Sequence, residues 1–316
     1  MTLAPRINDQ GLDGQGIADQ AARLRDLVLG VDSESSAEAE SARSPSPLQH
    51  TGLGTVVAVC SGKGGVGKTT FAVNAAAVLA RKGVRTIVVD LDVGVANADV
   101  LLGLTPRARL SRRALIEGRL AERLLATPYG LRLVAGIIGA SDASRLRPDE
   151  IDGAILGIER LRSHADLIFV DTGAGVGVES ITLAATADAS LIVTTPEPAS
   201  IADAYASHKC IAYAGVERGG QPKPSSWLIV NAADNAKQAN AAAARLNATS
   251  ERFLGGGLPC LGWIRRDRRV GRSAHARVPV AVNTPLCRVS RDIAGCAHAV
   301  WSACAARRAD VRTVGG

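Results

Sequence analysis

One stretch near the start of the chain constrains the fold more than any other. Residues 55–60 read TVVAVC, an uncharged and largely β-branched run that suits a strand buried on both faces. Residues 61–70 read SGKGGVGKTT and carry the spacing G-x-x-x-x-G-K-[ST] of a phosphate-binding loop. An Ala-rich segment without internal breakers follows and stops at Gly83, which predicts a helix. Strand, glycine loop and helix occur in the order that this loop requires.

The residue types of the loop fit a triphosphate. Its glycines let backbone N–H groups approach the phosphate oxygens, and the positive end of the following helix adds to the attraction. Lys68 can bridge the β- and γ-phosphates, and the Thr69 hydroxyl can ligate Mg²⁺. The predicted nucleotide site comprises Gly62, Lys63, Gly64, Gly65, Val66, Gly67, Lys68, Thr69 and Thr70.

Two further apolar runs end in carboxylates. Residues 84–90 (VRTIVVD) lead into Asp90 and Asp92, and residues 166–171 (DLIFVD) end at Asp171, the Walker B position, followed by TGAGVG. A carboxylate just beyond a strand end can hold Mg²⁺ through water or orient an attacking water. At least six apolar strands alternate with helices along the chain. We therefore predict an α/β fold, with a doubly wound, mostly parallel sheet, helices on both faces and the nucleotide at the strands' carboxyl ends.

Composition sets the limits of the domain organisation. The 316 residues suffice for one α/β domain and an extension. The formal net charge of +7 favours a partner with an acidic surface, but it does not indicate which kind of partner. Of six cysteines, Cys287, Cys296 and Cys304 fall near one another at the end of the chain, where small packing residues or a metal site are the alternatives. No secretory signal and no membrane-spanning run is recognisable, so we expect a cytoplasmic protein.

The N-terminal region has a different character. Residues 1–30 form a polar tail whose segment DQAARLRDLVL (19–29) predicts a short amphipathic helix, stable only on a partner. Residues 31–54 are rich in Ser, Glu and Ala, then carry Pro45 and Pro47, and predict a flexible linker. We place the nucleotide-binding domain at residues 55–316.

Several of these motifs together resemble one family. The octapeptide KGGVGKTT, with Lys63 as a second lysine, is similar to the deviant phosphate loop of the MinD/ParA ATPases, and DTGAG at 171–175 also matches. The stretch TPEPASIADAYA (195–206) and the N-terminal DQAARLR resemble the FlhG group, also called FleN or YlxH, of MinD-like regulators of flagellar number. The resemblance covers roughly residues 15–306.

The resemblance implies a set of roles. ATP and Mg²⁺ would be the cofactors, and ATP would drive a homodimer in which Lys63 reaches the phosphates of the other subunit. Asp92 would position the attacking water, Asp90 would support the metal site through water, and Asn231 would read the adenine edge. Gln20 in the N-terminal helix would stimulate GTP hydrolysis by FlhF, a GTPase of the signal-recognition-particle type.

The chain also departs from the family pattern. Asn231 is followed by Ala232 and not by the usual arginine, and Arg265 stands where the family tends to have proline. Residues 265–277 carry six arginines, for which a solvated face, anionic lipid, an acidic partner and DNA are open alternatives. The arginines at 107–113 are a solvated face or a polyanion site. A final helix at 285–308 either closes the core or lies on a membrane surface.

Three function hypotheses follow from these features. The leading one is an ATP-driven dimerising switch that regulates flagellar number and placement, activates an FlhF-type GTPase, and meets a flagellar transcription regulator or the inner face of the membrane. The second is a ParA-type partition ATPase that binds DNA without sequence preference. The third is a metabolic ATPase of the same group, for which the sequence offers no evident small-molecule pocket.

Overall fold

The computed structural model describes residues 53–93, 96–138, 145–217 and 225–314. The expected N-terminal helix, its Gln20 and most of the expected linker lie outside these residues. They remain predictions, as does the domain boundary at residue 55.

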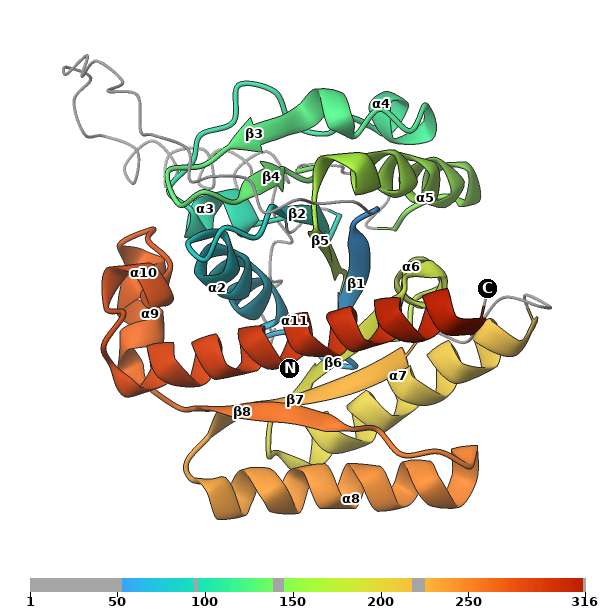
Figure 1. Ribbon diagram of the computed structural model, residues 1–316, viewed down its shortest axis with the longest axis vertical. Helices are drawn as coiled ribbons and strands as arrows, with labels where there is room; N and C mark the ends of the chain where they lie inside the picture. Colours follow the sequence, from blue (N-terminus) through green and yellow to red (C-terminus); the bar gives the residue numbers. More distant parts are fainter. Residues whose placement is uncertain (1–52, 94–95, 139–144, 218–224, 315–316) are drawn as a thin grey trace, which may run out of the picture. The chain divides into compact units, whose positions relative to one another are not determined.

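The core of the molecule is a single eight-stranded sheet (Figure 1). The strands are β1 (Thr55–Cys60), β2 (Thr86–Leu91), β3 (Leu124–Ala126), β4 (Arg132–Val134), β5 (Leu167–Thr172), β6 (Ala189–Thr194), β7 (Ser225–Ala233) and β8 (Cys260–Arg265). Their order is β3-β4-β2-β5-β1-β6-β7-β8, and every pair is parallel except β3 with β4. The five central strands β1, β2, β5, β6 and most of β7 are apolar because helices cover both of their faces.

Two layers of helices enclose the sheet, each over its own hydrophobic cluster. One layer consists of α2 (Lys68–Ala80), α3 (Ala98–Leu101), α9 (Arg268–His275), α10 (Val280–Asn283) and α11 (Arg288–Val314). The other consists of α4 (Arg112–Ile116), α5 (Pro148–Leu161), α6 (Val178–Thr186), α7 (Pro198–Glu217) and α8 (Ala236–Leu254). In Figure 1, α11 crosses the sheet on one side, and α7 and α8 lie together on the other. This confirms the predicted doubly wound architecture.

The strands that end in carboxylates are neighbours in the sheet. The register aligns Val59 of β1 with Asp171 of β5, and Asp171 with Asp90 of β2. Because parallel strands end at one edge, the phosphate loop after β1 and both carboxylates meet there. The fold thereby brings together segments that lie more than a hundred residues apart in the chain.

Two features differ from the sequence-based expectations. The short antiparallel edge strand β3 was not foreseen, because three residues carry too little periodicity. The last helix begins at Arg288 and not at Pro285, so Leu286 precedes it and is 84% exposed. The apolar side of α11 is buried in the core through Val289, Ile293 and Val300. That side closes the fold, and it is not free to lie on a membrane.

No helix among the described residues is both long enough and apolar enough to cross a bilayer.

A buried histidine gives the fold a pH dependence. His208 of α7 lies within 3.1 Å of the Ser250 hydroxyl of α8, and burial lowers the pKa of its imidazole below the usual 6.5. The stability that depends on neutral His208 is complete above about pH 6.5 and is lost as the pH falls toward the lowered pKa. We expect urea unfolding to show this loss, at up to about 1.4 kcal/mol per pH unit, and His208→Gln to reduce it. Identical pH profiles for the two proteins would contradict this assignment.

Candidate nucleotide site

The phosphate loop takes the backbone shape that its glycines permit. Gly65 and Gly67 have φ of 79° and 96°, in the left-handed region that disfavours other residues. Helix α2 begins at Lys68, inside the motif, so the sequence-based start after Thr70 was too late. The first N–H groups of α2 therefore point into the loop, where an anion would accept hydrogen bonds from them.

Close contacts fix the loop on two sides. A Cβ atom at Gly62 would lie 2.1 Å from the backbone carbonyl of Asp203 in α7, so only glycine fits there. A Cβ at Gly67 would lie 2.4 Å from Nδ2 of Asn231 at the end of β7. At Gly64, by contrast, the nearest atom would be the Ala174 Cβ at 3.9 Å. At Gly62 and Gly67, neighbouring atoms come so close that a side chain would collide with them. The motif alone did not distinguish this reason for glycine from a need for a flexible loop.

Beside the loop lies a carboxylate without a partner. Asp171 is fully buried, and neither of its oxygens has a hydrogen-bond partner among the described residues. Burial and the neighbouring Asp90 raise the pKa of Asp171, while the Thr69 hydroxyl and the Lys68 cation oppose that rise. An unpaired buried carboxylate is costly, and a divalent cation would remove the cost. Thr69 and Asp171 therefore fit the predicted Mg²⁺ site.

Asp90 has a second task that the sequence did not reveal. One of its oxygens accepts the N–H groups of Asn97 and Ala98, both at 3.0 Å, and the other accepts the N–H of Asp92 at 3.1 Å. Asp90 therefore anchors the start of α3 and the turn that carries Asp92. Its predicted water-mediated support of the metal is not tested by these contacts and stays a prediction.

Asp92 occupies a position consistent with its predicted role. Asp92 is half-buried, and burial raises the pKa of its carboxyl group although the Lys68 cation opposes the rise. A Cβ atom at Gly173 would lie 3.6 Å from Oδ1 of Asp92. Gly173 starts the loop after the Walker B strand. Its carbonyl accepts the hydroxyl of Ser180 at 3.0 Å, and the N–H of Gly175 bonds to the Ser61 carbonyl at 2.8 Å. Asp92 thus faces a loop that is itself tied to the phosphate loop.

Lys63 has a partner that sequence reasoning missed. Its Nζ lies 3.5 Å from Oε2 of Glu197, and both side chains are about half exposed. An ion pair at this exposure contributes little to stability. Glu197 belongs to the TPEP stretch that the sequence analysis identified, but the sequence did not reveal its contact with Lys63. The pair holds Lys63 at the surface beside the phosphate loop.

Asn231 also contacts the loop. Its Nδ2 donates to the Val66 carbonyl at 2.7 Å, which ties the end of β7 to the phosphate loop. The expected reading of adenine by Asn231 is untested and stays a prediction. The next residue, Ala232, has a φ of 54°, a conformation that a side chain without polar atoms does not favour.

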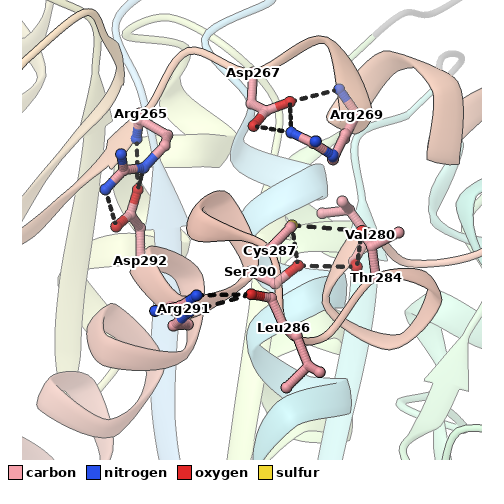
Figure 2. Close-up of polar contacts among 10 residues, drawn as sticks. All are labelled: Arg265, Asp267, Arg269, Val280, Thr284, Leu286, Cys287, Ser290, Arg291 and Asp292. Atoms are coloured by element: carbon pink, nitrogen blue, oxygen red, sulfur yellow. Dashed lines mark hydrogen bonds and ion pairs between the residues drawn. The ribbon is translucent and has the colours of Figure 1, made fainter.

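The residues after β8 are engaged within the chain (Figure 2). Arg265, at the position where the family tends to have proline, donates from Nε and Nη2 to the Asp292 carboxylate at 2.6 and 3.0 Å. Asp267 caps α9 by accepting the N–H of Arg269 at 2.8 Å and also pairs with its guanidinium. These contacts account for Arg265 and Asp267 as structural residues of the α9–α11 corner.

The other arginine and cysteine clusters also have structural explanations. Arg109 pairs with Asp99, Arg112 with Glu150 and Arg113 with Glu117, which leaves little positive charge at 107–113 for a polyanion. Cys296 and Cys304 are buried in the core, and burial raises the pKa of each to about 12. Cys287 contacts the hydroxyls of Ser290 and Thr284. The structure supports small packing residues over a metal site here.

Comparison with known proteins agrees with this geometry. Residues 57–280 match the CobQ/CobB/MinD/ParA nucleotide binding domain. The antiactivator FleN of Pseudomonas aeruginosa is 35% identical over 237 residues, which cover 74% of this chain and 82% of FleN. The chain belongs to the MinD/ParA family, in its FleN/YlxH group. The flagellum site-determining protein YlxH of Helicobacter pylori is 34% identical over 60% of this chain and 62% of its own length. The cell division ATPase MinD of Pyrococcus furiosus has the same fold, with a TM-score of 0.64 and 19% identity over 79% of this chain and 99% of its own.

Membership in this family makes the chain an ATPase with ATP and Mg²⁺ as cofactors. When bound, Mg²⁺ neutralises phosphate charge and polarises the γ-phosphate. The residues that would hold it are Thr69 and the unpaired Asp171, and Lys68 with the loop N–H groups would hold the phosphates.

The tight contact at Gly62 can be tested against its neighbour. We expect Gly62→Ala to lower the free energy of unfolding by about 1–3 kcal/mol and to weaken ATP binding, because the added methyl forces the loop away from α7. Gly64→Ala should change stability by less than about 0.5 kcal/mol, since its Cβ meets nothing closer than 3.9 Å. Thermal unfolding and fluorescent-nucleotide binding measure both effects. Equal effects of the two substitutions would show that close approach at Gly62 is not what matters.

Proposed function

We propose that this protein is an ATP-driven dimerising switch that regulates the number and placement of flagella. The observation that carries the proposal is the similarity to FleN over most of both chains, joined to a phosphate loop with the second lysine, Lys63. The names of two relatives, an antiactivator and a flagellum site-determining protein, support a regulatory task.

The geometry supports a sequence of steps for the switch. ATP binds with its phosphates on the loop N–H groups and Lys68. Lys63 then leaves Glu197 and reaches the phosphates of a second subunit, which joins two copies only while ATP is present. Asp92 orients the attacking water, and loss of the γ-phosphate releases the loop at Gly173. Hydrolysis thereby ends the dimeric state.

The N-terminal segment supplies the output in this proposal. The amphipathic helix expected at residues 19–29 docks on an FlhF-type GTPase, and Gln20 supports GTP hydrolysis there. A flagellar transcription regulator is a further partner, in keeping with the name antiactivator given to FleN. The protein acts in the cytoplasm, and a contact with the inner face of the membrane would have to use a surface other than the buried apolar side of α11.

One observation favours a second candidate, the ParA-type partition ATPase. Residues 265–292 hold eight arginines and two acidic residues, Asp267 and Asp292, a net charge of +6, of which Arg265, Arg266 and Arg269 pair with carboxylates. Arg268 and Arg272 lie four residues apart on α9, and both are exposed. Like charges at this spacing destabilise a helix unless an anion lies nearby. DNA is the polyanion that this alternative requires.

The role of Asp92 is open to a direct test. We expect Asp92→Ala to lower kcat for ATP hydrolysis by about 10²-fold or more and to leave ATP binding intact, because the water loses its orienting carboxylate. The variant should remain dimeric with ATP in size-exclusion chromatography with light scattering. Asp152→Ala, at an exposed position of α5, is the control. Hydrolysis by Asp92→Ala at the parental rate would contradict the assignment.

The proposed output can be measured on the GTPase. We expect the full-length protein and a peptide of residues 1–30 to accelerate GTP hydrolysis by the FlhF of the same organism, and Gln20→Ala to abolish the acceleration. Gln10→Ala, in the same tail outside the DQAARLR segment, is the matched control. A lack of stimulation by both full-length protein and peptide would refute this partner and leave the ATPase switch without its proposed output.

A further inference from the structure

The sheet order fixes the direction in which a nucleotide lies across the site. Strands β5 and β2 stand on one side of β1, and β6, β7 and β8 stand on the other. The unpaired carboxylate of Asp171 and the half-buried Asp92 lie at the ends of β5 and β2, so Mg²⁺ and the last phosphate belong on that side. Because the phosphates cross the loop after β1, the nucleoside extends the other way, toward the ends of β7 and β8.

The ends of β7 and β8 are tied to each other and to the phosphate loop. The N–H of Arg266 donates to the carbonyl of Ala233 at 2.9 Å, which joins the turn after β8 to the turn after β7. The side chain of Asn231 in turn reaches the carbonyl of Val66 in the phosphate loop. The two turns therefore lie together at the edge of the sheet that carries the phosphate loop.

An adenine ring is best held by a side chain that covers its face. A guanidinium does this well, because it is planar and its charge is attracted to the electrons of an aromatic face. Ala232, at the position where the family usually has arginine, carries only a methyl group. Residues 231–234 contain no cation, and neither they nor residues 265–267 contain an aromatic side chain. A cation for the base therefore has to come from the turn after β8.

Arg266 is the arginine of that turn that remains available to a ligand. Its neighbour Arg265 is bound by Asp292 of α11 through both Nε and Nη2 (Figure 2). The side chain of Arg266 is 60% exposed, and its Nε lies 3.2 Å from Oδ1 of Asp234, in the turn after β7. An ion pair at this exposure adds little stability. It does, however, draw the guanidinium across the end of β7, on the nucleoside side of the site.

We propose that Arg266 stacks its guanidinium on the adenine ring of ATP, in place of the arginine that position 232 lacks. Asp234 acts as a positioning residue, because its carboxylate holds Nε while the plane of the guanidinium faces the base. The inference goes beyond the proposed function, since it concerns nucleotide binding by a single subunit. It holds whatever the output of the switch is, and it does not require Asn231 to read the adenine edge.

A nucleotide and its base-free counterpart test the inference on the full-length protein. The probes are ADP and pyrophosphate, each with Mg²⁺, because neither carries the γ-phosphate that the ATPase reaction removes. In isothermal titration calorimetry we expect Arg266→Ala to weaken ADP binding by about fivefold or more and to change pyrophosphate binding by less than about twofold. Arg266→Lys keeps the charge but loses the plane, so it should also weaken ADP binding, by about threefold or more.

Arg272→Ala is the matched control, because it removes the same charge from an exposed position of α9. It should leave the binding of both probes unchanged, and circular dichroism melts confirm that each variant is folded. Equal losses for ADP and pyrophosphate in Arg266→Ala would show that the arginine acts only through its charge, and would overturn the inference. So would parental ADP binding by Arg266→Ala or Arg266→Lys, or an equal loss in Arg272→Ala. None of these outcomes bears on the proposed switch, which is tested by Asp92→Ala.

Discussion

The buried charges at the carboxyl ends of β1, β2 and β5 are the constraint on which the rest of the structure depends. Lys68, Asp90 and Asp171 are all removed from water, and Asp171 has no hydrogen-bond partner among the described residues. Burying charge in this way costs free energy, so a sheet that only had to be stable would place apolar residues there. The arrangement becomes favourable when phosphates and Mg²⁺ fill the space between these groups.

The surrounding elements hold these charges in place by close contact. Gly62 packs against the backbone of α7, and Asn231 joins the end of β7 to the Val66 carbonyl. Asp90 secures the turn that carries Asp92, and the Gly175 N–H ties the Walker B loop to Ser61. A displacement of the loop therefore meets α7, β7 and the Gly173 loop together. This connection gives a physical route by which loss of a phosphate can alter surfaces away from the nucleotide.

Much of the fold and part of the site followed from local sequence patterns. The phosphate loop, the carboxylates at strand ends and the apolar central strands were identified because each depends on a short contiguous stretch. Expectations failed where the pattern was too short or the partner too distant. The strand β3 has three residues, and Arg109 and Arg112 pair with carboxylates 10 and 38 residues away, which periodicity does not reveal. The helix expected from residue 285 begins at Arg288, so Leu286 lies outside it.

By itself, the sequence determined the fold class, the nucleotide chemistry and the family. The spacing of glycines, lysine and threonine is covalently fixed, and the strands around it are largely apolar up to the carboxylates near their ends. The pairing of Lys63 with Glu197, the contact of Arg265 with Asp292 and the cavity between α7 and α8 became known only from the folded arrangement of the chain. These contacts join residues brought together by the sheet order, and pairing at a distance leaves no periodic signal in a single sequence.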